Sequence, residues 1–265
     1  MGLVVSWWNH SSSCALPFSG GGAGGSSTDI VLHGVALGYR NAVAISGLSG
    51  RFAQGSLTAI VGPNGAGKTT LLKGLLGLVR PTQGWMECRW PARAMAYLSQ
   101  TNEVDRGFPI TVSDFVALGL WNRVGSLRAV GRPFRQCIAD AIAAVGLQGF
   151  EHTWISGLSG GQFQRVRFAR VLVQDAPVVL LDEPFAGIDT PTVEDLLRLI
   201  ARWHAEAKTV VTVVHDLELV RAHFPRTLAL AGHGLSWGET PESLNALAAF
   251  GRAGAPSAAP AAGRA

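Results

Sequence analysis

Continuous hydrophobic runs and amphipathic stretches alternate along this chain, and they have the lengths of strands and helices. The apolar runs at residues 178–181 and 210–214 predict strands covered on both faces, because a half-exposed strand would alternate apolar and polar positions. One set of apolar residues instead repeats at helical spacing: Ile138, Ala141, Ile142 and Val145. The alternation of the two kinds of segment predicts an α/β fold with parallel strands.

Capping residues and further apolar runs place the other elements. Thr111, with Asp114 three residues later, resembles a capping box that opens a helix through Leu120, and Pro191 suits the first turn of another helix. Further helices are expected at residues 69–78 and 159–173, and further strands at 29–39, 56–61, 94–98 and, last, 227–231. Helices dominate residues 101–174, which are expected to form a lobe inserted between the first strand–helix unit and the later parallel strands.

The two ends of the chain have the composition of disordered segments. Residues 1–28 contain low-complexity serine and glycine stretches, and residues 251–265 are rich in alanine, glycine and proline. Both ends are expected to be disordered, which leaves residues 29–250 for the folded domain.

Composition narrows the classes of protein that fit the chain. Hydrophobic residues make up 48% of it and charged residues only 15%, against an average of about 25%, yet no run of about 18 apolar residues predicts a membrane span. Two interpretations stay open: a well-buried core, or a peripheral protein that buries extra surface against partners. The net charge of +4 is mild and comes without a dense run of Lys and Arg, so no nucleic-acid partner is expected.

A glycine-rich loop follows the strand expected at residues 56–61. It matches the pattern G-x-x-x-x-G-K-[ST] in full, with the residues Gly62, Pro63, Asn64, Gly65, Ala66, Gly67, Lys68 and Thr69, followed by Thr70. Glycines let backbone N–H groups turn toward phosphates, and the N-terminus of the next helix adds a favourable dipole. Lys68 can reach the β and γ phosphates of a nucleotide, and the Thr69 hydroxyl can bind Mg²⁺.

Two carboxylates end the apolar run at residues 178–181. Asp182 stands where a direct or indirect contact to Mg²⁺ belongs. Glu183 comes next and is expected to point differently and to polarise an attacking water. The alternative is an ordinary polar strand end, but downstream of a phosphate-binding loop the pair indicates nucleotide hydrolysis.

A second glycine loop, without a lysine, lies between these two elements. It consists of Leu158, Ser159, Gly160, Gly161 and Gln162. Ser159 can cap the following helix, and the glycines expose N–H groups. The order of P-loop, pentapeptide and Asp-Glu strand, over about residues 29–250, resembles the ATP-binding subunit of an ABC transporter. In that family the pentapeptide is the signature motif, which contacts the γ-phosphate of ATP held by the P-loop of the opposite subunit.

The resemblance implies roles for four more residues. Tyr39 stands where the family has an aromatic that stacks on adenine, although a tyrosine of the core is the alternative. Gln100 resembles the Q-loop glutamine, which joins Mg²⁺ and the attacking water to the lobe that meets the membrane subunit. Asp189 lies in a stretch that resembles the D-loop, which crosses the dimer interface. His215 resembles the switch histidine that hydrogen-bonds the γ-phosphate.

The resemblance also implies an architecture, a reaction and partners. The expected fold is a P-loop NTPase core of RecA type with an N-terminal antiparallel β subdomain and an inserted helical subdomain. Two copies are expected to close head to tail around two ATP molecules with Mg²⁺, and hydrolysis is expected to drive separate integral-membrane permease subunits. The site residues are thereby expected to divide into catalytic Glu183, His215 and Gln100, and Mg²⁺-binding Thr69, Gln100 and Asp182.

The cargo is inferred from local sequence similarity outside the ATPase motifs. Residues 103–105, 108–112, 127–133 and 184–189 resemble importers of zinc, manganese or iron, which implies an extracytoplasmic metal-binding protein as an indirect partner and a peripheral position on the cytoplasmic face of the cell membrane. The alternatives are an exporter, an iron-chelate importer, or an ABC ATPase acting on nucleic acid without transport. One departure from the family is Phe163, where a polar residue is common; it is not expected to abolish activity.

Overall fold

The computed structural model describes residues 29–39, 42–100, 105–121 and 132–253, and these residues form two compact units. The first unit contains Phe52–Ser56 and Glu87–Thr212; the second contains Val31–Arg51, Leu57–Met86 and the described residues from Val213 onward. The expected disordered ends lie outside the described residues, apart from 251–253, and so do 103–104 and 127–131 of the importer-like segments. Across the described helices, none is long and apolar enough to cross a membrane.

The first unit combines parallel strands with helices. Its strands lie side by side in the order β5 (Met95–Leu98), β6 (Val178–Asp182) and β7 (Thr209–Val213). β5 and β6 are parallel, and their pairing starts with Met95 opposite Val178. The helix α6 (Thr190–Ala205) connects β6 to β7, as the crossover between parallel neighbours requires.

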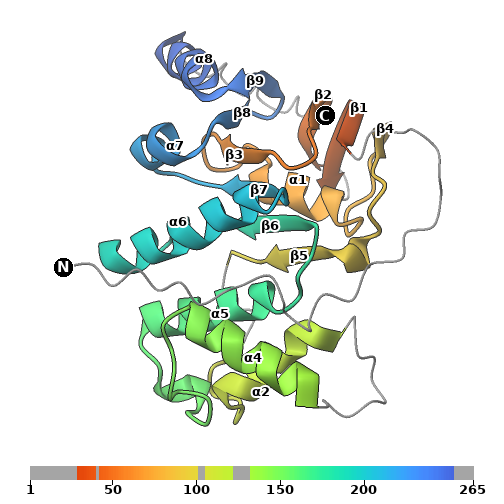
Figure 1. The fold of residues 1–265 in the computed structure, drawn as a ribbon. Helices are drawn as coiled ribbons and strands as arrows, with labels where there is room; N and C mark the ends of the chain where they lie inside the picture. Colours follow the sequence, from red (N-terminus) through yellow and green to blue (C-terminus); the bar gives the residue numbers. More distant parts are fainter. Residues whose placement is uncertain (1–28, 40–41, 101–104, 122–131, 254–265) are drawn as a thin grey trace, which may run out of the picture. The chain divides into compact units, whose positions relative to one another are not determined.

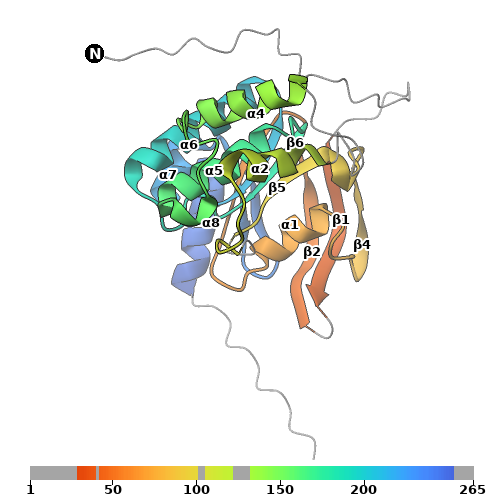
Figure 2. The same ribbon diagram turned by 90° about the horizontal axis from the view of Figure 1, so that it is seen from below.

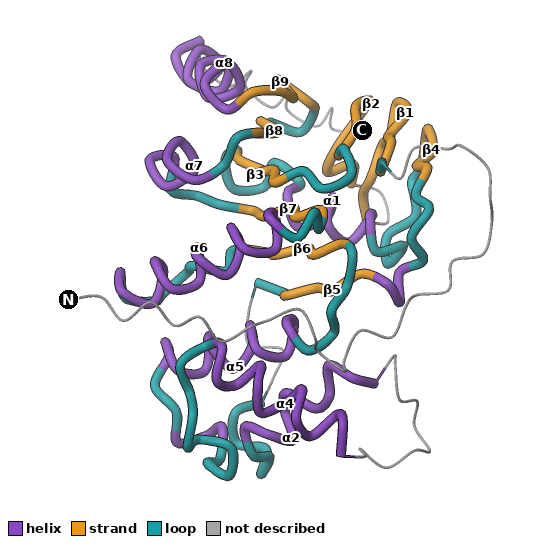
Figure 3. Tube along the Cα trace, viewed as in Figure 1, coloured by secondary structure: helices purple, strands orange, loops and turns teal. Residues whose placement is uncertain are grey.

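Three further helices pack together in the first unit, where Figures 1 and 3 show them side by side: α2 (Val112–Ala117), α4 (Arg132–Ala144) and α5 (Gly160–Leu172). Short 3₁₀ turns are η1 (Ala92–Ala94), η2 (Leu118–Leu120) and η3 (Ile155–Gly157). The Thr111 hydroxyl accepts the Asp114 amide at 3.1 Å, which confirms the cap expected from the sequence. The expected helix through Leu120 is α2 continued by η2.

The core of the first unit follows the hydrophobic pattern. Every residue of β6 and β7 is buried, which confirms that these strands are covered on both faces. The four apolar residues at helical spacing in and after α4 are buried as well. Between α5 and α6, the rings of Phe168 and Trp203 lie in parallel planes, and their centres are 6.0 Å apart. This contact fixes α5 against α6, and both helices carry site residues.

The second unit contains two groups of strands. One group has the order β2 (Ala42–Phe52), β1 (Ile30–Tyr39) and β4 (Gln83–Glu87), which lie together in Figure 2. The other has the order β3 (Leu57–Val61), β8 (Arg226–Leu230) and β9 (Gly234–Glu239), with β3 parallel to β8 and β9 antiparallel to it. The helices of this unit are α1 (Lys68–Leu75), α7 (Leu217–His223) and α8 (Thr240–Ala253).

The strand expected at residues 227–231 is present as β8, but the expectation that it is the last strand is wrong. β9 follows it, and α8 follows β9. Buried hydroxyls anchor the start of α8: Thr240 Oγ1 donates to the Phe224 carbonyl at 2.6 Å, and Ser243 Oγ donates to the Thr227 carbonyl at 2.9 Å. Polar anchors leave no hydrophobic signal in the sequence. β2 and β4 escape prediction for a related reason, since glycine and exposed positions interrupt their pattern.

Candidate functional site

The first glycine loop runs from the end of β3 to the start of α1, in the second unit. Gly62 has φ 151°, and a Cβ there would lie 2.1 Å from the Leu230 carbonyl oxygen at the end of β8. Gly67 has φ 92°, and a Cβ there would lie 2.4 Å from the Ile45 side chain of β2. Only glycine fits these two places, so the loop can take its path between β2 and β8 without displacing either strand.

The lysine of this loop is folded back over it. Lys68 is 6% exposed, and its Nζ donates to the carbonyl oxygens of Gly62 and Pro63, at 2.9 Å each. No side chain caps the N-terminus of α1, and no acidic residue stands in its first turn. By contrast, side chains cap α2, α5, α6 and α7. An uncapped helix N-terminus next to a lysine ammonium is an arrangement that suits a phosphate.

Two further site residues belong to the second unit. Tyr39 ends β1 with half of its surface exposed, at 51%, so the alternative of a core tyrosine is wrong. His215 is exposed directly after Val214, whose amide donates to the Ile60 carbonyl of β3 at 3.1 Å. His215 therefore stands beside the strand from which the glycine loop starts. Asp216 does not share this place in the site, because its carboxylate caps α7.

The two carboxylates after β6 differ in their surroundings. Asp182 is fully buried at the strand end, and Tyr97 Oη donates to its Oδ2 at 3.4 Å. Glu183 has left the strand conformation: its φ is 50°, a left-handed value that costs a residue with a side chain about 1–2 kcal/mol. The backbone therefore turns sharply between the two residues, and the side chain of Glu183 departs from the strand's alternation. Such strain at a strand end is typical of a functional position.

Each of the residues expected to hold Mg²⁺ offers an oxygen atom. They are the Thr69 hydroxyl, the Gln100 amide and the Asp182 carboxylate. Mg²⁺ prefers oxygen ligands and is commonly held by one or two carboxylates together with substrate phosphates and water, so a single buried carboxylate fits the ion. No group of three or more His, Cys, Asp or Glu residues gathers as a metal site in the described part of the chain.

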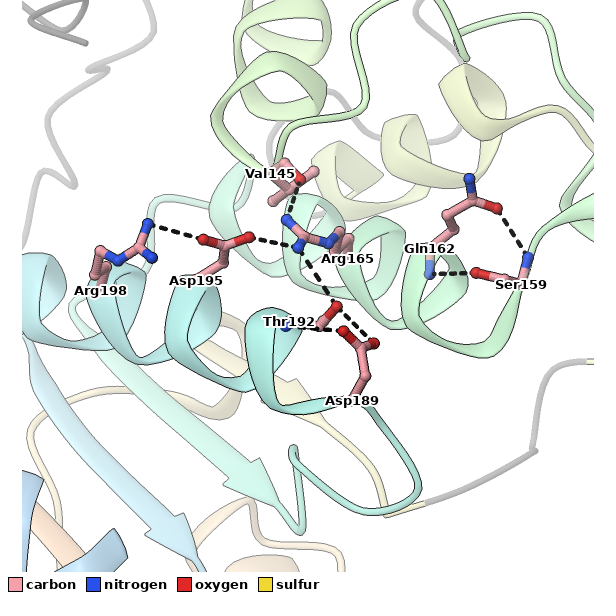
Figure 4. A network of polar contacts seen from close by, with 8 residues as sticks. All are labelled: Val145, Ser159, Gln162, Arg165, Asp189, Thr192, Asp195 and Arg198. Carbon is pink, nitrogen blue, oxygen red and sulfur yellow. Dashed lines mark hydrogen bonds and ion pairs between the residues drawn. The ribbon is translucent and has the colours of Figure 1, made fainter. Parts of the chain in front are cut away.

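The second glycine loop starts α5 with a complete capping box. Ser159 Oγ accepts the Gln162 amide at 3.2 Å, and Gln162 Oε1 accepts the Ser159 amide at 2.9 Å, which confirms the expected cap (Figure 4). Because the Ser159 oxygen acts as an acceptor here, its O–H can still donate to another group. A Cβ added at Gly161 would lie 3.0 Å from Asp189 Oδ1, so this glycine lets the loop and Asp189 approach closely.

Two polar side chains of α5 bind the backbone beside other site residues. Gln164 Nε2 donates to the Pro184 carbonyl at 2.6 Å, one residue after Glu183. Arg167 donates to the Ser99 carbonyl, one residue before Gln100, and also to Gln164 Oε1. The sequence reasoning missed both residues. Their signal is that Gln164 and Arg167 are polar residues at i and i+3, each next to a phenylalanine, in a helix of mixed polarity.

The surroundings of Phe163 explain why an aromatic residue stands where the family commonly has a polar one. Phe163 is 8% exposed, and its ring lies 5.7 Å from that of Phe115 in α2. The guanidinium of Arg106 lies 5.1 Å from the centre of the Phe163 ring and also donates to the Leu158 carbonyl. The aromatic ring thus supports an arginine that holds the first residue of the second glycine loop.

A polar network joins α5 to α6 next to this loop (Figure 4). Arg165 donates to the Val145 carbonyl at 3.1 Å, to Thr192 Oγ1 at 3.4 Å and to the Asp195 carboxylate. The Thr192 hydroxyl and amide both donate to Asp189, at 2.9 and 3.2 Å. These hydrogen bonds, the side-chain one foremost, lower the pKa of Asp189, and the charge of Arg165 adds to the effect.

The first unit therefore gathers five of the expected features around α5. Contacts of α5 reach the residues beside Gln100 and Glu183, the second glycine loop opens the helix, and Asp189 lies against Gly161. Asp182 immediately precedes Glu183 at the end of β6. The second unit separately brings His215 close to the strand that leads into the first glycine loop. Taken separately, the second unit has a loop that suits phosphate, and the first has a strand-end carboxylate that can accept a hydrogen bond from water.

Comparison with known proteins gives consistent matches. The model of the ABC transporter family matches residues 45–186. The chain is 42% identical to the manganese transport system ATP-binding protein MntB of Listeria monocytogenes, over 75% of this chain and 85% of that protein. It is 39% identical to the zinc transport system ATP-binding protein TroB of Treponema pallidum, over 73% of this chain and 75% of that protein. A solved dimeric bacterial ABC transporter cassette has a TM-score of 0.70 and 25% identity, covering 80% of this chain and 98% of the other.

Replacing the loop lysine is expected to weaken nucleotide binding. Lys68→Ala removes a charge-assisted hydrogen bond to phosphate, a contribution of about 1.5–3 kcal/mol, so the Kd for ATP should rise roughly tenfold or more. Titration calorimetry with ATP measures the change. Lys73→Ala, in the last turn of the same helix, is the control and should bind ATP about as tightly as the unchanged protein. Equal affinity in the two variants would contradict the role of Lys68.

Proposed function

The chain belongs to the ABC transporter family as an ATP-binding, ATP-hydrolysing subunit, and on this premise we propose that it energises the uptake of a divalent metal ion through a separate permease. Its fold is the α/β P-loop NTPase fold of ABC cassettes, as the sequence predicts. The relatives named for manganese and zinc transport support manganese, zinc or iron as the cargo.

The contrast between the two glycine loops supports a nucleotide site that two copies of the chain share. The helix after the first loop has an N-terminus without a side-chain cap and a lysine beside it, which suits phosphates bound by the same copy. The helix after the second loop is closed by its capping box, and this loop has no lysine. It offers the Ser159 O–H and a glycine surface, which suit one wall of a site that another molecule completes.

In the proposed dimer, two copies close head to tail around two ATP molecules. Each ATP lies between the P-loop of one copy, residues 62–70, and the signature loop of the other, residues 158–162. Tyr39 stacks on the adenine, and Lys68 binds the β and γ phosphates. The dimeric cassette of known structure supports this arrangement.

The reacting groups come from the copy that holds the P-loop. Thr69, Gln100 and Asp182 would hold Mg²⁺, which would neutralise charge on the phosphates. Glu183 accepts the hydrogen bond of the attacking water and polarises it, with its backbone fixed through the contact of Gln164 to Pro184. His215 hydrogen-bonds the γ-phosphate. Preorganised N–H groups and the lysine then stabilise the charge of the transition state.

The lobe of about residues 101–174, within a cassette of residues 29–250, carries the movement to the permease. Arg167 ties α5, the signature helix that follows the signature loop, to the backbone beside Gln100, so a shift of the lobe changes the position of the Q-loop. Exposed apolar side chains of the lobe support a contact between the lobe and a partner: Phe108, Leu118, Trp121 and Trp154. Contact with a permease implies a peripheral protein on the cytoplasmic face of the cell membrane. An extracytoplasmic metal-binding protein is then an indirect partner.

Neutralising the proposed base separates binding from chemistry. Glu183→Gln keeps the shape of the side chain but cannot act as a base, so ATP hydrolysis should fall by about a hundredfold or more while the Kd for ATP stays within about twofold. Phosphate release and calorimetry measure the two quantities. Glu194→Gln, an exposed position of α6, should hydrolyse ATP normally. Hydrolysis at the unchanged rate in Glu183→Gln would show that another group is the base.

Blocking the signature loop tests the composite site. Ser159→Arg should leave ATP binding to the P-loop intact but prevent dimer closure and hydrolysis, because the long side chain occupies the surface that meets the partner's γ-phosphate. Ser159→Gly retains a good helix-capping residue without the hydroxyl, so it should hydrolyse more slowly but still dimerise. Sedimentation with ATP and phosphate release are the measurements. Full activity of Ser159→Arg would rule out a site shared between copies.

The cargo is tested with the complete transporter in liposomes. ATP hydrolysis should rise when the permease and the metal-binding protein are present together with Mn²⁺, Zn²⁺ or Fe²⁺, and the metal should accumulate on the side of the vesicle that contains the ATPase subunit. The same vesicles assembled with Glu183→Gln should transport nothing. Movement of the ion in the other direction would indicate an exporter. Stimulation by DNA or ribosomes, with none by the permease, would indicate an ATPase without a transport role.

A further inference from the structure

We propose that Arg165 is a positioning residue that makes the signature loop and Asp189 of one copy move as a single piece, so that the partner's two contacts form together. This inference rests on the proposed ATP-dependent dimer, and it adds a residue to which the motifs assign no role. It starts from the network of Figure 4, in which one guanidinium contacts three residues in two other segments, the chain after α4 and the start of α6.

Arg165 lies in the second turn of α5 and its side chain is 18% exposed. It donates to the Val145 carbonyl just after α4, to the Thr192 hydroxyl in the first turn of α6, and to the Asp195 carboxylate one turn further on. A planar guanidinium with several fixed donors can serve these directions at once, whereas a lysine ammonium on a flexible stem cannot hold the same geometry. Arg165 thereby fixes the start of α6 relative to α5.

The network continues from Thr192 to the signature loop. The Thr192 hydroxyl accepts from Arg165 and donates to Asp189 Oδ1 at 2.9 Å. The same Asp189 oxygen is so close to Gly161 that an added Cβ would lie only 3.0 Å from it. Gly161 and Asp189 therefore lie close together within one copy, and the hydroxyl of Thr192 links Asp189 to Arg165.

Charge strengthens the arrangement. Asp189 and Asp195 stand at the start of the same helix, and Arg165 is the cation that faces both. The second oxygen of Asp195 pairs with Arg198, which is 72% exposed and lies on α6 itself. Removing Arg165 therefore breaks this polar link between α5 and the start of α6, while removing Arg198 leaves that link intact. The chain thus supplies a matched control.

The consequence concerns dimer closure. In the proposed dimer the signature loop meets the partner's ATP, and the D-loop with Asp189 faces the partner as well. When both loops are locked together, one rigid surface forms all contacts at once and little conformational freedom is lost on closure. With the lock removed, ATP still binds the P-loop, but closure needs more ATP.

The experiment measures dimer formation in the Glu183→Gln protein, in which bound ATP is not consumed. Arg165→Gln and, separately, Thr192→Val are added to it, and the ATP concentration at half-maximal dimer is determined by sedimentation. Both should raise this concentration about fivefold or more, while Kd for ATP in the monomer changes less than twofold. Thr192→Val keeps the size of the side chain and every charge, so it interrupts the network without a large packing change.

Controls separate the outcomes. Arg198→Gln should dimerise like the Glu183→Gln protein, and Arg165→Lys should show a shift between those of Arg165→Gln and the unchanged residue. If Glu183→Gln alone forms no dimer with ATP, the proposed composite site fails. If it dimerises and both Arg165→Gln and Thr192→Val dimerise at the same ATP concentration, the role of Arg165 is overturned. An equal shift in Arg198→Gln would also overturn it, because the effect would then belong to Asp195 alone.

Discussion

Hydrogen bonds from the side chains of α5 to the backbone of other segments are the interaction on which the first unit's site depends. Three side chains of this helix, Arg165, Arg167 and Gln164, each donate to a carbonyl oxygen of a different segment. Carbonyls in loops have no ladder partner and must be satisfied some other way when they are covered. The helix supplies those partners, and in doing so it fixes the backbone on which Gln100 and Glu183 stand.

This constraint explains why the signature helix is both polar and buried. The side chain that donates to the Pro184 carbonyl, Gln164, is only 7% exposed. Arg165 and Arg167 donate to the carbonyls of Val145 and Ser99. A buried polar group without a partner costs about 1–3 kcal/mol, so the helix is stable in this place only while its partners stay in position. The same helix thereby contacts both the end of α4 in the lobe and the backbone next to the strand-end carboxylates. Phe163 of the same helix supports a further backbone contact, since its ring packs against Arg106, which donates to the carbonyl of Leu158, the first residue of the signature loop.

The two glycine loops show how one local pattern serves two purposes. In the P-loop the glycines allow a close path between strands, with a lysine folded back over the loop. In the signature loop the serine cap closes the helix, and Gly161 makes room for Asp189. The difference lies in what surrounds the loops. It supports the assignment of one loop to ATP in the same copy and the other to ATP in the partner.

The sequence by itself determined the family, the α/β class, the buried strands β6 and β7 and the caps at Thr111 and Ser159, because all of these depend on residues close together in the chain. It also located the phosphate loop and the Asp-Glu pair at a strand end. It did not reveal β9 and α8, which are anchored by hydroxyls such as Thr240, or the glycine-interrupted β2. Only the tertiary structure decided the left-handed turn at Glu183, the exposure of Tyr39 and the partners of Arg165. The physical reason is that these features depend on segments tens of residues apart in the chain packing together, and no periodicity or motif records which segments meet in space.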